Sequence, residues 1–178
     1  GNSERENYDQ AKIIQDMIGR KLDNMYPVRH AEIGNERLRV EHLYVPHPYI
    51  ADRYLAEDIS FSVRAGEVLG LAGLVGAGRS ETVMSVFGEL PHSKGEIFVD
   101  GRQVRIKNSR DALANGIALV TEDRKKYGLH FTWSIKKNIS LSNLKNMLAG
   151  PFISSKKENA TAQKYYDAMM VKANGLKD

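Results

Sequence analysis

The sequence has no cysteine and no long hydrophobic run, and each absence excludes a class of protein. Without cysteine there are no disulfides and no thiolate zinc sites, which is compatible with a cytoplasmic protein. The longest apolar stretch, residues 68–78, is rich in glycine and too short to cross a bilayer. The N-terminal residues are too polar for a signal peptide. A membrane role would therefore have to come through a partner.

Charge and histidine show no concentrated pattern either. The 178 residues carry 26 Lys and Arg against 22 Asp and Glu, and the net charge of +4 is spread along the chain. Nucleic-acid-binding proteins gather basic residues into clusters interleaved with aromatics, and no such cluster is visible. The five histidines lack the spacing of metal ligands, and no Ser/His/Asp constellation is found. The sequence thus argues against a nucleic-acid platform, a histidine metal site and a serine hydrolase.

The most informative segment that is present runs from Gly73 to Ser80 and reads GLVGAGRS. It meets the P-loop pattern G-x-x-x-x-G-K-[ST] at every fixed position except one, where Arg79 stands for lysine. Glycines let backbone N–H groups turn inward and cradle phosphate oxygens. We expect a short buried strand over 68–72 before the loop and a helix over 81–87 after it, whose N-terminus favours an anion. The sequence therefore predicts a phosphate-binding loop.

The first thirty-five residues have the pattern of a helix and a connector. Ser3 and Glu6 have the spacing of a capping box. Apolar residues then recur at helical spacing from Ile14 to Met25, and Pro27 ends the pattern. The polar run 29–35 is interpreted as a linker. The segment is predicted to be an amphipathic helix that packs on its own domain or on a partner.

From residue 36 the apolar period changes to two, which predicts strands. Leu38, Val40 and His42 are expected to share one face. A loop with two prolines and three tyrosines follows, and strands are expected over 59–63 and 95–101. The partner strand of the latter would hold Val104 and Ile106. The three loop tyrosines are Tyr44, Tyr49 and Tyr54.

The second half of the chain is mainly helical in pattern. We expect a short helix over 109–115, with Ser109 as its N-cap and Gly116 just past its end. Residues 117–120 have the pattern of a further buried strand. Two longer helices are predicted over 135–148 and 156–171.

Taken in order, these pieces resemble an ABC transporter ATP-binding domain. The resemblance is stronger to the second ATP-binding half of the tandem sugar-import ATPases of the ribose, galactose and xylose type. It rests on the linker-like IIQDMIGR (13–20), ISFSVRAGE (59–67), the arginine-bearing loop, TEDRK (121–125) and WSIKKNI (133–139). Nothing in the sequence resembles the LSGGQ-type signature, the Walker B strand or the switch histidine. The resemblance therefore implies a part of a larger polypeptide.

The resemblance implies an α/β fold: a partial P-loop NTPase core, an antiparallel β-subdomain and the start of a helical subdomain. Residues 1–35 would be the linker helix and connector from a preceding half. Residues 36–178 would be the N-terminal part of the ATP-binding domain. ATP and Mg²⁺ are the implied cofactors, with Ser80 on the metal and Glu122 at the Q-loop position. The nucleotide-binding residues would be Gly73, Leu74, Val75, Gly76, Ala77, Gly78, Arg79, Ser80 and Glu81, and one of the three tyrosines would stack on adenine.

The same resemblance implies partners and a location. The partners would be the first ATP-binding half of the same polypeptide and transmembrane sugar permease subunits, at the cytoplasmic face of the plasma membrane. Nucleic acid is not expected, and the isolated segment is predicted to be soluble and to self-associate through exposed apolar surface. With a lone arginine-bearing loop and no Walker B acid, no residue is assigned a catalytic role, and nucleotide binding without hydrolysis is expected.

Two other functions fit some of the same residues. A non-hydrolysing nucleotide-sensing or regulatory module would use the same loop to hold an interface. An unrelated P-loop kinase would need an acceptor pocket and a lid with clustered arginines, which the sequence does not show.

Overall fold

The computed structural model describes residues 10–18 and 31–178, and it divides into two compact units. The first ends at Ile117, and the second runs from Ala118 to Asp178. The helix α1 (Gln10–Ile18) confirms part of the predicted N-terminal helix. The rest of that prediction, with the capping box and Pro27, lies outside the described residues.

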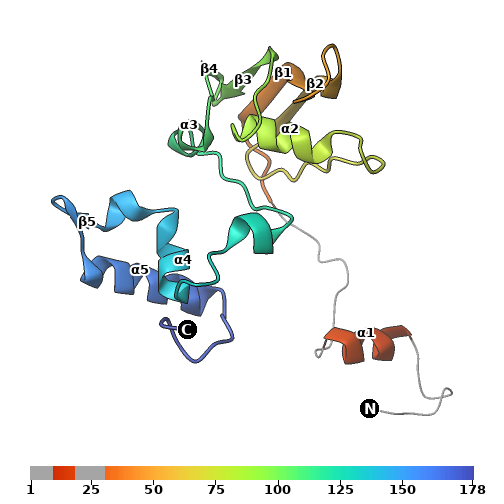
Figure 1. Ribbon diagram of the computed structural model, residues 1–178. Coiled ribbons are helices and arrows are strands. Elements are labelled where there is room, and N and C mark those ends of the chain that lie inside the picture. The colour runs from red at the N-terminus through yellow and green to blue at the C-terminus, as the bar shows by residue number, and fades with distance from the viewer. Residues whose placement is uncertain (1–9, 19–30) are drawn as a thin grey trace. The chain divides into compact units, whose positions relative to one another are not determined.

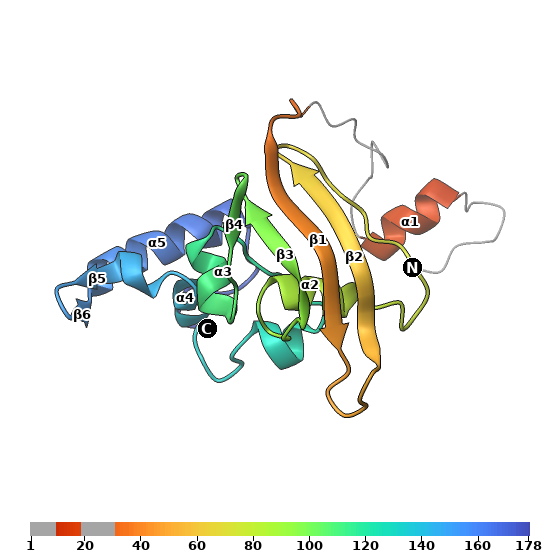
Figure 2. The same cartoon turned by 90° about the horizontal axis from the view of Figure 1, so that it is seen from above.

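The first unit is built on a four-stranded antiparallel sheet in the order β2-β1-β3-β4 (Figure 1). The two long strands are β1 (Glu36–Pro46) and β2 (Tyr54–Arg64), which lie side by side and curve together in Figure 2. The inner strand β3 (Lys94–Val99) pairs with the short edge strand β4 (Arg102–Val104). The period-two pattern predicted this hairpin pairing with Val104 in the partner strand, but Ile106, expected in the same strand, lies beyond its end and is buried in the core.

Two helices complete the first unit, α2 (Arg79–Val86) and α3 (Ser109–Ala114). Both contribute to one apolar core on one face of the sheet. The buried core residues are Val40, Leu43, Val45, Ala56, Val86, Ile97, Ile106 and Ala112. The core therefore fixes α2, and with it the loop that precedes α2, against β1 and β2.

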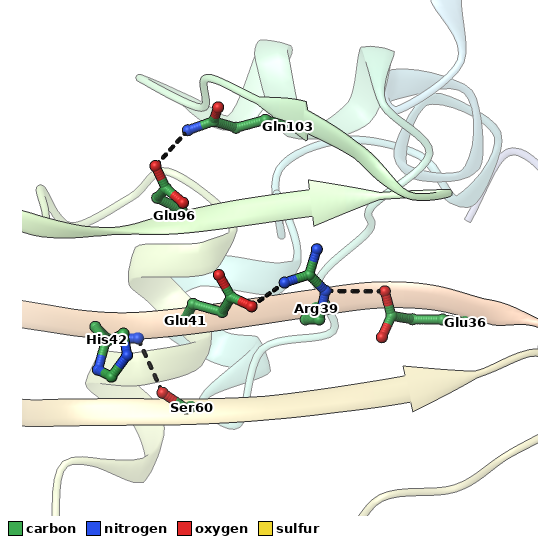
Figure 3. A network of polar contacts seen from close by, with 7 residues as sticks. All are labelled: Glu36, Arg39, Glu41, His42, Ser60, Glu96 and Gln103. Atoms are coloured by element: carbon green, nitrogen blue, oxygen red, sulfur yellow. Dashed lines mark hydrogen bonds and ion pairs between the residues drawn. The ribbon is translucent and has the colours of Figure 1, made fainter.

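The opposite face of the sheet carries a polar network (Figure 3). Arg39 bonds to Glu36 at 3.1 Å and to Glu41, and its guanidinium lies 3.8 Å from the ring centroid of Phe98. On the neighbouring strands, Gln103 donates to Glu96 at 2.9 Å. Apart from Glu36, which a register shift separates from Leu38, these residues alternate with the buried ones, as the period of two requires.

A bulge changes the phase of β1 at His42 and corrects one expectation. Val40 pairs with Phe61 and Leu43 pairs with Ile59, so two residues of β1 stand opposite the one residue between them. His42 has a φ of 49° and is exposed, and Leu43 takes the core position instead. Because the strands continue past the bulge, Tyr44 and Tyr54 lie in β1 and β2 rather than in a loop.

Two predicted strands are not formed. Residues 68–72 and 117–120 have no regular structure, and no strand in the described part of the chain pairs with them. Val68 is 76% exposed and Val120 is 95% exposed, so the apolar runs do not lie in a core. A strand needs a neighbour to satisfy its backbone N–H and C=O groups, and an apolar pattern cannot supply that neighbour.

The second unit is mainly helical. After the π-helical turn η2 (Arg124–Gly128) come α4 (Ile135–Leu141), the 3₁₀ turn η3 (Leu144–Met147), a hairpin of β5 (Leu148–Ala149) and β6 (Phe152–Ile153), and α5 (Ser155–Ala168). Lys136 of α4 forms an ion pair with Glu158 of α5 at 3.3 Å. The helix predicted over 135–148 is shorter than expected, because α4 ends at Leu141 and the 3₁₀ turn η3 follows.

A side-chain cap begins α3, and it is one residue earlier than predicted. Asn108, with an extended φ of −161°, accepts a hydrogen bond from the backbone N–H of Asp111 at 3.1 Å. Ser109 is already the first residue of the helix. Gly116 follows the helix with a φ of 79°, as predicted.

Candidate phosphate-binding site

Residues 73–78 form a loop between the irregular segment 67–72 and α2, exposed except at Gly78, and Arg79 and Ser80 are the first two residues of the helix. Gly76 and Gly78 have φ values of 83° and 76°, in the left-handed region that L-residues with a β-carbon avoid. At Gly78 a β-carbon would also lie 2.3 Å from the Leu55 carbonyl oxygen and 3.1 Å from Ala56 Cβ. The base of the loop therefore packs directly on β2, and glycine is required there on two grounds.

The helix that follows presents its free N–H groups at the loop. The first N–H groups of an α-helix have no acceptor within the helix, and Gly78 has no side chain to cap them. Thr82 is buried, and both its backbone N–H and its hydroxyl donate to the Gly78 carbonyl, at 2.9 and 2.7 Å. This arrangement fixes the first turn and leaves the earlier N–H groups for an anion, which the helix dipole also favours.

The side chains of the loop divide into apolar and polar groups. Leu74 and Val75 are 85% and 100% exposed. Arg79 and Ser80 are exposed at the start of α2, and Arg79 Nη2 donates to the Leu74 carbonyl at 3.4 Å. The nine residues from Gly73 to Glu81 thus lie in one loop and the first turn of α2. The cation of Arg79 and the hydroxyl of Ser80 lie beside the free N–H groups of that turn.

Glu122 lies in the second unit and is exposed. The next residue, Asp123, accepts hydrogen bonds from the backbone N–H groups of Lys125 and Lys126 at 3.1 and 3.0 Å. These bonds cap the π-helical turn and hold the segment after Glu122 in one conformation. The approach of Glu122 to a metal stays a prediction.

The three candidate tyrosines differ in their surroundings. Tyr44 and Tyr54 contact each other edge to face, with ring centroids 5.2 Å apart, and Lys94 Nζ lies 5.1 Å from the Tyr44 ring centroid. Tyr49 is 91% exposed in the turn between β1 and β2. Tyr54 directly precedes Leu55, whose carbonyl contacts Gly78.

A second group of aromatic residues forms a braced turn in the second unit. His130 and Trp133 stack with centroids 4.6 Å apart, and Phe131 between them is 67% exposed. Asn138 accepts from the His130 N–H at 2.9 Å and donates to the carbonyls of His130 and Trp133 at 3.0 and 3.2 Å. Sequence reasoning missed Asn138, because nothing in its spacing marks it as the residue that holds this turn.

The edge of the sheet carries a shallow hollow of about 430 Å³. Its lining includes His92, Glu96, Gln103 and Arg105. Partial burial lowers the pKa of His92 below its ordinary value. In the described part of the chain, no group of three or more His, Cys, Asp or Glu residues is placed to hold a metal ion. The glycine-rich loop before α2 therefore remains the main candidate site.

Comparison with known proteins agrees with this geometry. Residues 56–175 match the family described as ABC transporter. A ribose import ATP-binding protein, RbsA, of Geobacillus kaustophilus is 44% identical over 168 residues, which is 94% of this chain and 32% of that protein. A xylose import ATP-binding protein, XylG, of Moorella thermoacetica is 44% identical over 146 residues, 82% of this chain and 29% of that protein.

A solved structure shows the same fold. The structure of cbiO1 from Clostridium perfringens, part of an ABC transporter complex, aligns with a TM-score of 0.58 at 18% identity, over 81% of this chain and 53% of that one. The chain belongs to the ABC transporter family, with an α/β fold that corresponds to part of an ABC ATP-binding domain. It spans about a third of the length of the sugar-import relatives named above. Among the described residues, no helix is both long and apolar enough to span a membrane.

Proposed function

We propose that this chain is a nucleotide-binding part of the energising subunit of a sugar importer, and that residues 73–81 bind Mg-ATP. The observation that carries this proposal is the packing of Gly78 on Leu55, which fixes a left-handed glycine directly before a helix with free N–H groups. That arrangement is a cradle for phosphate oxygens. The sugar-import names of the relatives support the transport role.

Each residue of the loop has a proposed task. Backbone N–H groups at the start of α2 would hold phosphate oxygens, Arg79 would offset their charge, and Ser80 would offer its hydroxyl to Mg²⁺. Ser80 is preferred to Thr82 for the metal, because Ser80 is exposed whereas Thr82 is buried. Bound Mg²⁺ would neutralise charge on the phosphates. Adenine stacking is proposed for one of Tyr44, Tyr49 and Tyr54.

We infer that these residues bind nucleotide without hydrolysing it by themselves. Hydrolysis of ATP needs a group that positions the attacking water, besides Mg²⁺ and charge neutralisation. The two side chains proposed to face the phosphates, Arg79 and Ser80, are a cation and a hydroxyl, and neither is a general base at neutral pH. Steady phosphate release that disappears in Arg79→Ala would contradict this inference.

The proposed partners are transmembrane permease subunits at the cytoplasmic face of the plasma membrane and the first ATP-binding half of the same polypeptide. The aromatic turn supports the permease contact, because Asn138 holds Phe131 and Trp133 in a fixed, partly exposed arrangement. Glu122 is proposed to be the Q-loop residue that links the metal to the permease.

Calorimetric titration of MgATP tests the nucleotide proposal on the wild-type chain, Arg79→Ala and Arg102→Ala. Arg102 is an exposed arginine of β4 and serves as the matched control for loss of one charge. We expect binding by the wild type and by Arg102→Ala, and at least about tenfold weaker binding by Arg79→Ala, since a hydrogen bond to a charged group contributes about 1.5–3 kcal/mol. Equal affinity in all three proteins, or no binding by the wild type, would contradict the proposal.

A further inference from the structure

Positive charge is concentrated in the second unit, which corrects the even spread expected from the sequence. Residues 118–178 contain eleven Lys and Arg against five Asp and Glu, a net charge of +6. Residues 1–117 contain fifteen Lys and Arg against seventeen Asp and Glu, a net charge of −2. Such an asymmetry between two parts of a chain is typical of proteins that contact nucleic acid or a membrane surface.

The densest part of this charge is the π-helical turn η2, where Arg124, Lys125 and Lys126 are consecutive and exposed. None of the three forms an ion pair with a carboxylate in the part of the chain that the structure describes. The neighbouring carboxylate of Asp123 accepts the backbone N–H groups of Lys125 and Lys126 instead. The turn therefore presents three consecutive cations to an anionic partner.

Exposed apolar and aromatic side chains follow the cations at every second position. These residues are Tyr127, Leu129, Phe131 and Trp133. Tyrosine and tryptophan favour the boundary between membrane and water, where one end of the ring is apolar and the other is wet. Leucine and phenylalanine gain free energy when they leave water for an apolar phase. A nucleic acid would stack on the aromatic rings but would offer nothing to the exposed leucine, so the pattern favours lipid.

We propose that residues 124–133 bind directly to the surface of a membrane that contains anionic phospholipid. The cations of η2 lie at the headgroup phosphates, and Leu129 and Phe131 enter the boundary with the acyl chains. Electrostatic attraction and apolar burial add to each other in a contact of this kind. The contact goes beyond the proposed function, because it holds the second unit at the membrane without the permease. The proposed permease contact also uses Phe131 and Trp133, so the cations of η2 are what distinguishes lipid from a protein partner.

Vesicle sedimentation tests the contact on the full 178-residue chain. The vesicles are phosphatidylcholine alone, or an equal mixture of phosphatidylcholine and the anionic phosphatidylglycerol. We expect binding to the mixed vesicles that weakens as salt is added, and little binding to phosphatidylcholine alone. Trp133 is the only tryptophan of the chain, so a blue shift of its emission on the mixed vesicles locates the contact. Failure to bind the mixed vesicles would overturn the proposal and leave the permease as the partner of this segment.

Two triple variants separate the local cations from the net charge. Arg124→Gln/Lys125→Gln/Lys126→Gln removes the charge of η2, and Lys164→Gln/Lys172→Gln/Lys177→Gln removes the same charge from exposed lysines elsewhere in the second unit. The first variant should bind the mixed vesicles at least about tenfold more weakly, because each basic residue near an anionic surface adds to the binding free energy. The second should bind within about threefold of the wild type. Equal loss in the two variants would overturn the proposal.

The apolar part of the contact is tested with Phe131→Ser, and Phe152→Ser in the β5–β6 hairpin is the matched control. Phe131→Ser should weaken binding to the mixed vesicles at least about threefold, and the control should match the wild type. Equal loss in both would place the contact elsewhere and overturn the proposal. If poly-dT shifts the Trp133 emission and the mixed vesicles do not, the segment is a nucleic-acid surface and the proposal is overturned. None of these measurements contains ATP, so their outcome is separate from that of the MgATP titration.

Discussion

Gly78 and Gly101 have nearly the same φ angle in different surroundings. Their φ values are 76° and 74°, but a β-carbon at Gly101 would meet open space, whereas one at Gly78 would overlap the Leu55 carbonyl. Gly101→Ala should destabilise the first unit by about 1–2 kcal/mol, the cost of a left-handed L-residue. Gly78→Ala should cost at least about 1 kcal/mol more, because backbone must move.

The measurement is urea unfolding followed by hydrogen exchange in β1 and β2, which isolates the first unit of a chain with two units. Equal losses for the two variants would show that Leu55 does not press on the loop. Weaker MgATP binding in Gly78→Ala alone would tie this packing to the site.

α2 buries two hydroxyl groups, of which only one has a hydrogen-bond partner. Ser85 Oγ has no hydrogen-bond partner, whereas the Thr82 hydroxyl donates to the Gly78 carbonyl. Ser85→Ala should therefore leave the free energy of unfolding unchanged or raise it by up to about 1 kcal/mol. Thr82→Val should lower it by about 1 kcal/mol or more, because it leaves the carbonyl with one fewer donor. The same hydrogen-exchange assay measures the free energy of unfolding of both variants. A loss of stability in Ser85→Ala as large as in Thr82→Val would show that the Ser85 hydroxyl does have a stabilising partner.

The motif at Gly73–Ser80 predicts which residues form the candidate site, but it does not predict which contacts hold the loop in place. Local spacing identifies the glycines, the arginine and the serine, because their task is set within eight residues. The Leu55 carbonyl lies far from Gly78 in the sequence and becomes its neighbour only through the packing of α2 on β2. The hydrogen bond that the Leu74 carbonyl accepts from Arg79 could not be predicted either, because every residue type has a backbone carbonyl.

At the scale of elements, three helices end in the same hydrogen-bonded motif, with glycine at the left-handed position in two of them and methionine in the third. Gly88 follows α2, Gly116 follows α3 and Met170 follows α5. In α5 the N–H of Met170 donates to the Asp167 carbonyl and that of Val171 donates to the Tyr166 carbonyl, at 3.0 and 3.1 Å. Met170 has a φ of 49°, which an L-residue adopts at a cost.

Met170→Gly should therefore stabilise the end of α5 by about 1 kcal/mol. Met170 is 81% exposed, so little packing is lost. Slower exchange of the Val171 amide in the variant is the expected readout. Met169→Gly is the control, because Met169 has a φ of −91° and gains nothing from glycine. Faster exchange in Met170→Gly would refute the prediction.

His92, beside the β3–β4 hairpin, links stability to pH. Burial lowers its pKa in the folded state, so the neutral form is favoured there and stability is lost as the pH falls below the unfolded value of about 6.5. His92→Asn should flatten the dependence of unfolding free energy on pH between about 7 and 5. NMR titration of the His92 ring gives the pKa directly, and a value at or above the ordinary 6.5 would contradict the prediction.

Alternating apolar residues predicted the strands β1, β2 and β3 and the pairing of β3 with β4, because burial and pairing there depend on residues close together in the sequence. The same pattern failed over 68–72 and 117–120, where apolar residues are present but no described strand pairs with them. The bulge at His42 was missed for a related reason, since it depends on how two neighbouring strands pair with β1. Gly95 of β3 illustrates this dependence on the neighbouring strand, because it lies against the bulged part of β1. A β-carbon at Gly95 would lie 2.6 Å from Leu43 Cα.

At the scale of the whole molecule, the unpaired apolar segments predict self-association. Val68 and Val120 are 76% and 95% exposed. Each lies in an apolar run whose sequence predicts a strand, although no strand forms there. Exposed runs of this kind tend to pair with another copy. We expect dimers or larger species of the 178-residue chain at micromolar concentration, measured by light scattering.

The variant Val68→Ser/Val120→Ser tests whether these segments drive the association. Both positions lie outside residues 73–81, so the proposed nucleotide site keeps its side chains. Ile50→Ser is the matched control, since Ile50 is 46% exposed in the turn between β1 and β2. The double variant should shift the chain toward monomer and the control should not. A monomeric wild type would refute the prediction, and equal association in both variants would place the contact elsewhere.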